Sequence, residues 1–387
     1  MTPLTVAWIS DFPLEWMPNM PEPIPHLPKD HPATWEMALL GEFQKNPQIR
    51  LHIIALRKGI SRSFSFQRHG ATFHVLKYFG GMRGPSLFWT DTLLIGRELR
   101  RIKPDVVQAW GNERGAGLVA SRLPWPCLVT VQGLFSYYRE KLPDFPGAKL
   151  SAWAERTSLS RARHASGESS FVVDYLLKAY PHLTVHHVEH VPDSLFAAIR
   201  RQPARNPIRF VTNGTIGYRK GTDLFLKALA ALLDQVAFEA LIIGSPNPQF
   251  IEPLRQSLPA RLWDRVTFRS GLTPPDVARE LETATIFVMP SRADTGPMAV
   301  KEAVLAGVPV VASKLGGTPD YIASGNNGLL FQPDSLADLT AVLQAAVHHP
   351  MFSTGAIAPG SSAHARQALS PRAMAAAFCD AYMAARG

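Results

Sequence analysis

Apolar and polar positions follow two kinds of pattern in this chain. Short runs of β-branched and other apolar residues, such as TVAWIS at residues 5–10, are followed by longer segments with apolar residues at helical spacing. This exchange of strand and helix patterns is typical of parallel sheets that helices cover on both faces. In the first half it predicts strands over residues 5–10, 51–56, 72–78, 105–110 and 127–131, and helices over residues 87–103, 151–160 and 169–179.

The pattern pauses once and then starts again. Residues 192–207 (PDSLFAAIRRQPARNP) have proline at both ends and little strand character, as in a linker between domains. We therefore predict an α/β chain of two doubly wound, Rossmann-like domains. In the second domain the pattern predicts strands over residues 208–213, 238–243, 265–268, 286–289, 308–312 and 329–331, and a helix over residues 222–233.

The predicted domain boundaries follow from these elements. The first domain covers residues 1–195, the linker 196–207, the second domain 208–365 and a final helical segment 366–387. Within that segment an amphipathic helix is expected over residues 371–385, because Met374, Phe378 and Tyr382 recur every four residues. The proline-dense residues 19–32 are predicted to form a loop between the first strand and the first helix.

Composition agrees with a globular protein of this kind. The chain has 387 residues, enough for two domains at about 150 residues each, and apolar residues make up 46% of it. Cys127 and Cys379 are the only cysteines, which excludes a disulfide framework and a cysteine-based zinc site and favours a cytoplasmic location. No uncharged apolar stretch of about 18 residues occurs, so neither a signal peptide nor a membrane span is predicted.

Positive charge is in excess, mainly in the first half. The net charge is +9, and residues 1–200 contribute 23 basic and 17 acidic side chains. Two interpretations stay open: a surface for anionic lipid or a phosphorylated substrate, or an ordinary basic surface. No dense run of Lys and Arg and no RNA-recognition signature is present, so no nucleic-acid partner is predicted.

The candidate chemistry concentrates in residues 289–328, where a predicted strand ends and a loop carries Asp294 and Gly296. Pro297 suits a first helical position, which would leave the N–H groups of Met298 and Ala299 to face an anion. Asp294 and a later acid, Glu302, are eight residues apart and could turn toward one ligand. In the alternative interpretation Asp294 caps the helix and Glu302 is a solvated helix residue.

A second candidate region, residues 212–221 (TNGTIGYRKG), follows the first strand of the second domain. Its glycines predict a flexible turn, and Arg219 and Lys220 precede the helix over residues 222–233. Two cations and the helix N–H groups could neutralise a diphosphate there. Alternatively, they are two exposed charges at a loop tip. In the first domain, the glycine pair of GAGLVA at residues 115–120 is predicted to serve helix packing rather than dinucleotide binding.

Together these residues resemble family 4 glycosyltransferases, which are retaining enzymes of the GT-B fold. The resemblance is most specific over residues 208–347, through GTIGYRKG, LIIGSPNP and EAVLAGVPVVASKLGGTPDYI, and is looser in the first domain. It implies two domains facing across a cleft, a nucleotide sugar on the second, an acceptor on the first and a C-terminal helix that crosses back to the first.

The resemblance also implies roles for individual residues. The second acid of the pair, Glu302, would hold the donor ribose, and the first, Asp294, would contact the transferred sugar. The chain departs from the family in having Asp294 in place of Glu, Thr215 in place of Arg and Gln132 in place of His. The catalytic set is Lys220, Arg219, Asp294, Glu302 and Gln132, and the donor-binding set is Gly214, Thr215, Gly244, Gly271, Leu272, Gly296, Pro297, Met298 and Ala299.

The resulting prediction is a retaining hexosyltransferase-type enzyme that moves a sugar from a nucleoside-diphosphate sugar to a glycan or lipid-linked acceptor. No DxD motif is present, and protein cations are expected to replace a metal ion, so no cofactor is predicted. Over residues 57–68, 78–89 and 135–141, Arg or Lys alternates with aromatic residues that are expected to be exposed, which suits a membrane interface or a carbohydrate surface. We predict an acceptor approached at the cytoplasmic face of a membrane. In the alternative, most of these aromatic residues belong to the core and the cations are ordinary surface. Two alternatives stay open: a non-catalytic GT-B-like protein that binds a sugar nucleotide, and a sugar-nucleotide epimerase.

Overall fold

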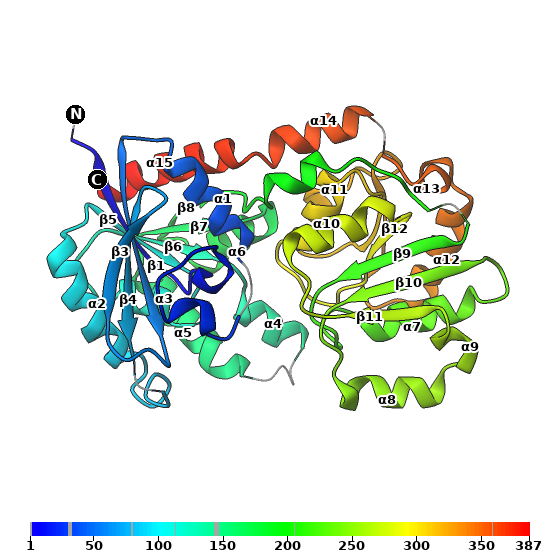
Figure 1. Ribbon diagram of the computed structural model, residues 1–387, viewed down its shortest axis with the longest axis horizontal. Helices are drawn as coiled ribbons and strands as arrows, with labels where there is room; N and C mark the ends of the chain where they lie inside the picture. Colours follow the sequence, from blue (N-terminus) through cyan, green and yellow to red (C-terminus); the bar gives the residue numbers. More distant parts are fainter. Residues whose placement is uncertain are drawn as a thin grey trace. The chain divides into compact units, whose positions relative to one another are not determined.

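The computed structural model describes residues 2–29, 33–78, 80–112, 114–142, 147–204, 206–357 and 359–387. The chain forms two compact units (Figure 1): unit 1 contains residues 1–191 and 371–387, and unit 2 contains residues 192–370. The predicted fold class is confirmed, because each unit is built around a largely parallel sheet with helices. Residues 192–207, predicted as a linker, group with unit 2.

Unit 1 is an eight-stranded sheet in the order β3-β4-β2-β1-β5-β6-β7-β8. Every neighbouring pair is parallel except β3 and β4, which form an antiparallel pair at one edge. The strands are β1 (Leu4–Ile9), β2 (Ile49–Arg57), β3 (Phe64–Arg68), β4 (Ala71–Lys77), β5 (Val106–Trp110), β6 (Cys127–Val131), β7 (His164–Gly167) and β8 (Thr184–His187). The helices are η1 (Leu14–Trp16), η2 (Ile24–His26), α1 (Thr34–Phe43), α2 (Trp89–Ile102), α3 (Ala116–Ala120), α4 (Phe135–Lys141), α5 (Ala148–Arg161), α6 (Ser170–Ala179) and α15 (Pro371–Arg386).

Three strands of unit 1 were not predicted. β7 (HASG) and β8 (TVHH) have four residues each, and β7 has no β-branched residue, so neither produces a recognisable strand pattern. β3 lies at the sheet edge with half-buried and exposed residues only. Short strands of this kind are determined by pairing with a neighbour rather than by their own sequence.

The C-terminal helix α15 belongs to unit 1, as predicted. Its apolar residues Met374, Phe378 and Tyr382 are all buried. The Tyr382 hydroxyl accepts a hydrogen bond from Trp8 Nε1 at 3.0 Å and donates one to Gln108 Oε1. These bonds connect the last helix to the central strands β1 and β5, so residues more than 270 positions apart share one core.

The predicted packing role of the 115–120 glycines is confirmed. A Cβ at Gly117 would lie 3.1 Å from Val129 Cγ1 and 3.2 Å from Ser158 Oγ. Gly115 has φ +88°, and a Cβ there would clash with the Phe88 ring. Both glycines therefore allow α3 to approach its neighbours closely.

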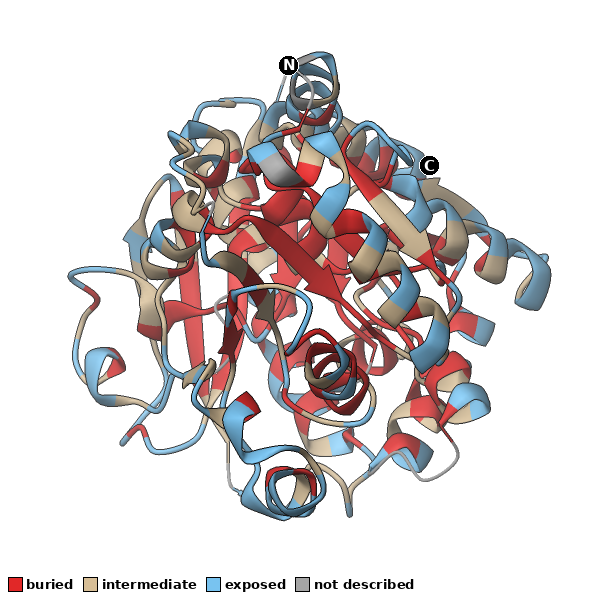
Figure 2. Cartoon of the chain, turned by 90° about the vertical axis from the view of Figure 1, so that its right-hand side faces the viewer, coloured by how far each residue is buried: buried red, intermediate tan, exposed pale blue. Residues whose placement is uncertain are grey.

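Unit 2 is a six-stranded, fully parallel sheet in the order β11-β10-β9-β12-β13-β14. Strands β10, β12 and β13 are largely buried, the edge strand β11 has only half-buried and exposed residues, and the helices are exposed on their outward faces (Figure 2). The strands are β9 (Ile208–Asn213), β10 (Phe238–Ile243), β11 (Val266–Arg269), β12 (Ile286–Met289), β13 (Val310–Ser313) and β14 (Gly328–Phe331). The helices are η3 (Ser194–Ala198), α7 (Thr222–Ala231), α8 (Pro248–Ser257), α9 (Ala260–Trp263), α10 (Pro274–Thr283), α11 (Met298–Leu305), η4 (Thr318–Asp320), α12 (Leu336–His348), α13 (Pro350–Thr354) and α14 (Pro359–Ala368).

Side-chain caps begin several helices of unit 2. The Thr273 hydroxyl accepts a bond from Asp276 N while the Asp276 carboxylate accepts one from Thr273 N, which is a capping box. Ser335 caps α12 and Asn247 caps α8 in the same manner, with one bond each. Each such cap satisfies a helix N–H group that has no partner within the helix. In the described part of the chain, none of the helices has the length and apolar character needed to cross a bilayer.

Candidate functional site

The candidate site of unit 2 lies at the carboxyl ends of two adjacent strands. β9 pairs with β10 on one side and with β12 on the other, in the middle of the sheet. The segment 214–221 follows β9, and the segment 290–297 follows β12. In open parallel α/β sheets, ligands bind outside the carboxyl ends of the strands where the chain connections diverge.

Two of the predicted glycines allow the backbone to come unusually close at this edge. Gly221 has φ +69°, and a Cβ there would lie 1.8 Å from the carbonyl oxygen of Pro290. A Cβ at Gly244 would lie 2.2 Å from the carbonyl oxygen of Gly214. The turns after β9, β10 and β12 therefore pack backbone against backbone, which no larger residue permits.

A pocket of about 270 Å³ opens at this turn. Three of the predicted residues, Gly214, Thr215 and Lys220, line it. Gly271 and Leu272 come after β11, and a Cβ at Gly271 would meet no atom within 4 Å. The lining residues are Thr212, Asn213, Gly214, Thr215, Ile216, Lys220, Thr222, Phe225, Ile242, Ile243, Met289 and Pro290.

Lys220 and Asp294 form an ion pair across the two segments. Lys220 Nζ lies 2.5 Å from Asp294 Oδ2, and the other carboxylate oxygen accepts a bond from Thr295 N at 3.1 Å. Burial alone would raise the pKa of Asp294, but the charges of Lys220 and Arg219 hold it below its usual value. The helix-cap interpretation of Asp294 is wrong, because Pro297 is the residue that precedes α11 and no side chain caps that helix.

Glu302 is buried on α11, with an exposed fraction of 9%. Asn213 Nδ2 donates to its Oε2 at 3.4 Å, which connects it to the turn after β9. Burial raises the pKa of Glu302 to about 8, and the bond from Asn213 offsets this only in part. The interpretation of Glu302 as a solvated helix residue is therefore wrong.

Arg219 lies on the same turn as Lys220. Its Nη1 donates to the carbonyl oxygen of Ala293 at 3.2 Å, so both predicted cations contact the segment that follows β12. The alternative of two exposed charges at a loop tip is wrong, because both side chains are half-buried.

Arg292, which the sequence did not indicate, supports this turn. Its guanidinium donates to both carboxylate oxygens of Asp223, at 2.7 and 2.8 Å, and to the carbonyl oxygen of Tyr218 at 2.7 Å. It also lies 3.8 Å from the centre of the Tyr218 ring. Arg292 N donates to the carbonyl oxygen of Arg219 at 2.8 Å. Arg292 therefore fixes the segment that presents Arg219 and Lys220.

The start of α11 contains the remaining donor-binding candidates. The helix begins at Met298 rather than at Pro297, so the predicted first helical position is off by one residue. Gly296 and Pro297 are buried, and Met298 and Ala299 are half-buried. These four residues follow Asp294 directly and belong to the same edge of the sheet as Lys220.

Gln132 lies in unit 1, directly after β6, whereas Lys220 lies in unit 2. Its Nε2 donates to Glu36 Oε1 at 3.4 Å, and Glu36 also accepts a bond from the Ser10 hydroxyl. Asn213, in contrast, is part of the unit 2 site and was not predicted as such. Its position as the last residue of β9, before Gly214, was the signal that could have indicated it.

No group of three or more His, Cys, Asp or Glu side chains in the described ranges is arranged to hold a metal ion. The independence of a metal stays a prediction. The residues that converge in unit 2 offer instead two cations, one buried carboxylate in an ion pair and one buried carboxyl group. This set can bind an anion and accept hydrogen bonds from hydroxyl groups.

Curated proteins similar to this chain are glycosyltransferases and related synthases. The sequence is 30% identical over 209 residues to alpha-maltose-1-phosphate synthase of Mycolicibacterium smegmatis, covering 49% of this chain and 53% of that protein. It is 32% identical over 138 residues to sulfoquinovosyl transferase SQD2 of Arabidopsis thaliana, covering 35% and 26%. Over 132 residues it is 31% identical to lipopolysaccharide glucosyltransferase WaaG of Escherichia coli, covering 33% and 34%. The matched region thus spans between about a quarter and about half of these relatives.

Solved structures extend the likeness to the whole fold. Sucrose-phosphate synthase from Thermosynechococcus elongatus has a TM-score of 0.78 at 15% identity, covering 98% of both chains. HepE from Anabaena, solved with UDP, has a TM-score of 0.68 at 15% identity, covering 99% of this chain and 100% of that one. Residues 207–349 match the family Glycosyl transferases group 1. Residues 207–349 are therefore similar to group 1 glycosyltransferases, in line with the resemblance to family 4 enzymes, and the chain has the GT-B fold.

Proposed function

We propose that this chain transfers a sugar from a nucleoside-diphosphate sugar to a glycan or lipid-linked acceptor. The observation that carries the proposal is the arrangement after β9 and β12, where Lys220 pairs with Asp294 at 2.5 Å and Asn213 bonds Glu302. At this edge of the sheet the cations can bind the diphosphate of the donor, and the buried carboxyl group can bind its ribose. The glycine turn lets the backbone approach the donor closely.

In this proposal Lys220 and Arg219 bind the diphosphate. Lys220 is paired with Asp294, so a diphosphate oxygen would share or replace that partner. The turn that carries both cations is fixed by Arg292, which holds them in position. Such pre-positioned charges stabilise the negative charge that develops on the leaving diphosphate.

Glu302 would accept hydrogen bonds from the ribose hydroxyls, and Asp294 would contact the transferred sugar. Retention of the anomeric configuration and independence of a metal belong to the same proposal. Support comes from the cations themselves, since two protein charges at the diphosphate supply the stabilisation for which other transferases use a divalent ion.

The acceptor is proposed to be approached at a membrane surface. On α2, Trp89 and Leu93 are 54% and 69% exposed, and Arg97, Arg100 and Arg101 follow on the exposed positions of the same helix. Exposed apolar residues beside arginines suit anionic lipid, where each cation gains about 1 kcal/mol. The names of similar proteins, such as lipopolysaccharide glucosyltransferase WaaG, support a lipid-linked acceptor.

Of the three segments predicted to reach the membrane, we propose only residues 78–89 for that contact. In residues 135–141, Tyr137 and Tyr138 are buried with exposed fractions of 6% and 7%, because α4 packs them into unit 1. In residues 57–68, Phe66 stacks on Phe73 at 5.1 Å between ring centres. The expectation of exposed aromatic residues in these two segments is wrong, because Tyr137 and Tyr138 are buried and Phe66 is half-buried at the sheet edge.

Activity is tested by incubating the chain with UDP-, GDP- and ADP-linked hexoses and extracted glycolipids, followed by mass spectrometry of the products. The proposal expects a hexose adduct that disappears when Lys220 is replaced, and α-configured product from an α-configured donor in the anomeric NMR signal. Lys227→Ala is the matched control, because Lys227 is 42% exposed and outside the site. Epimerised nucleotide sugar without any adduct would contradict the proposal.

A further inference from the structure

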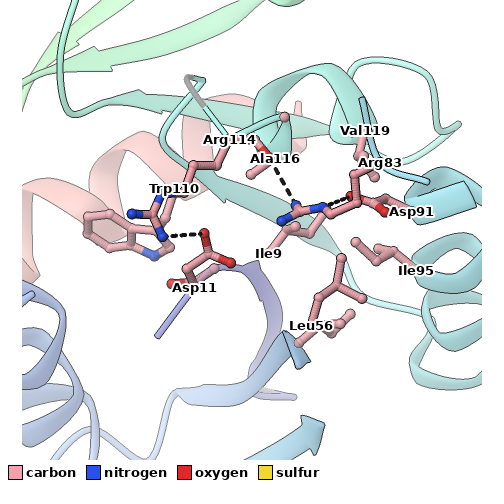
Figure 3. A pocket seen from close by; sticks show the side chains of 13 residues that line it. Ile9, Asp11, Leu56, Arg83, Asp91, Ile95, Trp110, Arg114, Ala116 and Val119 are labelled. Atoms are coloured by element: carbon pink, nitrogen blue, oxygen red, sulfur yellow. Dashed lines mark hydrogen bonds and ion pairs between the residues drawn. The ribbon is translucent and has the colours of Figure 1, made fainter. Parts of the chain in front are cut away.

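Unit 1 contains a pocket that the donor site does not use. It lies at the carboxyl ends of β1 and β5 and, together with the solvent at its mouth, encloses about 340 Å³ (Figure 3). β1 pairs with β2 on one side and β5 on the other, so the connections diverge here as they do at β9 in unit 2. Ligands of open α/β sheets bind at such a point.

Two arginines line this pocket, and a carboxylate orients each of them. Arg83 Nε donates to Asp91 Oδ2 at 2.6 Å, and Arg114 Nη1 donates to Asp11 Oδ2 at 3.3 Å. Arg83 Nη2 also donates to the carbonyl oxygen of Arg114 at 3.0 Å, which joins the two segments. Figure 3 shows both guanidinium groups turned toward the same space, with the Asp11 carboxylate facing Arg114.

The two ion pairs differ in exposure. The side chains of Arg83 and Asp91 are 25% and 1% exposed, whereas those of Arg114 and Asp11 are 54% and 36% exposed. An exposed pair contributes at most about 1 kcal/mol, so another anion can take the place of Asp11 with little loss. The buried pair, in contrast, keeps Arg83 in a fixed orientation.

A buried donor in the same pocket is not used within the described residues. Trp110 Nε1 is buried and has no hydrogen-bond acceptor there. Its ring is held by edge contacts with Trp8 and Phe378, each at 5.3 Å between ring centres. Buried donors are nearly always satisfied, which makes Trp110 Nε1 an available donor for a ligand oxygen that reaches it.

We infer that this pocket binds an anionic group, a phosphate ester or a carboxylate, of the acceptor. Arg83 and Arg114 pair with its oxygens, and Trp110 Nε1 donates to one of them. A guanidinium group can donate two parallel hydrogen bonds to two oxygens of a carboxylate or of a phosphate, whereas an ammonium group acts as a single point charge. The assignment to the acceptor rests on the proposed function, whereas the binding of an anion in unit 1 does not.

The test is a set of calorimetric titrations of the full chain with glucose 6-phosphate, glucuronate and glucose. One or both charged probes are expected to bind more tightly than glucose, and the stronger one identifies the type of anion. Arg114→Gln should weaken that binding by about tenfold, as expected for a lost charge-assisted bond. Trp110→Phe removes the Nε1 donor and should weaken it as well. Arg163→Gln, at an exposed position elsewhere in unit 1, is the matched control.

The same titrations with Lys220→Met separate this pocket from the donor site, because that variant removes the cation of unit 2. Unchanged binding of the charged probe in Lys220→Met, with loss in Arg114→Gln, supports the inference even if no sugar transfer is found. Equal binding of charged and neutral probes, or full binding in Arg114→Gln, would overturn it.

Discussion

The two units share one architecture but differ in the residues at the carboxyl ends of their central strands, where ligands are expected to bind. In unit 2 the turns approach so closely that a Cβ at Gly221 or Gly244 would overlap a carbonyl oxygen. In unit 1 the corresponding edge uses long side chains, Arg83 and Arg114, each oriented by a carboxylate. Where the backbone must lie against a ligand, only glycine or another small residue fits at that position. Where side chains reach a ligand from loops, many residue types are possible at the loop positions. The difference explains why unit 2 is the more recognisable half.

The largest effect, on the free energy of unfolding, should come from adding a side chain at Gly221. Gly221→Ala places a Cβ 1.8 Å from the carbonyl oxygen of Pro290 at a positive φ, so the turn after β9 must move. The expected loss in the free energy of unfolding is about 3–5 kcal/mol, from the left-handed conformation and the overlap together. Urea denaturation of the full chain measures it.

Gly271→Ala is the matched control for that variant. Gly271 has the same φ of +69°, but a Cβ there meets no atom within 4 Å. It should cost only about 1–2 kcal/mol, the penalty of the conformation alone. Equal losses for the two variants would show that close backbone packing does not constrain unit 2.

The second effect concerns donor chemistry. Lys220→Ala should lower kcat/KM by about 30-fold or more, because the charge that binds the diphosphate is lost. The single variant leaves Asp294 buried without its cation, so the double variant Lys220→Met/Asp294→Asn serves where the single one is unstable. Turnover close to the native value in both variants would remove Lys220 from the site.

A pH effect should follow from the buried carboxyl group. The pKa of Glu302 is raised to about 8 by burial, so the folded state holds a proton that the unfolded state releases near pH 4.5. The stabilising contribution is complete below the unfolded pKa and is lost as the pH rises to 8, with a slope of at most about 1.4 kcal/mol per pH unit. Glu302→Gln should flatten that slope in denaturation curves between pH 5 and 8. An unchanged slope would contradict the assignment.

The smallest effect is expected in unit 1. Tyr382→Phe removes the hydroxyl that accepts from Trp8 Nε1 at 3.0 Å, which leaves that donor buried without its partner. The expected cost is about 1 kcal/mol in the free energy of unfolding. Tyr218→Phe, at a position 54% exposed in unit 2, should cost nothing measurable. A similar loss for both would mean that α15 is not integrated into unit 1.

The sequence predicted much of the fold because long buried strands have a strong apolar pattern. β9, β10 and β12 were predicted with their observed limits, and each has at least four consecutive residues with a strand-like pattern. β7 and β8 were missed because pairing with neighbours, not composition, makes them strands. The buried state of Tyr137 and Tyr138 was missed for a similar reason, since a short helix such as α4 does not reveal which face it turns inward.

For the site, the sequence indicated Lys220, Asp294 and Glu302 but not how they are connected. The ion pair between Lys220 and Asp294 joins segments 74 residues apart, which no local pattern reports. Arg292 was missed because its role depends on reaching back to Tyr218, again across a distance in sequence. The spacing of residues in the sequence can indicate candidate site residues, but their hydrogen-bond and ion-pair partners can be identified only in the folded structure.

The most direct test of the account is whether the nucleotide binds to unit 2 and not to the pocket of unit 1. Calorimetric titration with UDP and GDP should show binding of at least one nucleotide to the native chain. We predict that this affinity falls by about 30-fold or more in Lys220→Met/Asp294→Asn and stays unchanged in Arg114→Gln. Undiminished nucleotide binding in the unit 2 variant, or a loss confined to the unit 1 variant, would contradict the assignment of the donor to the edge formed by β9 and β12.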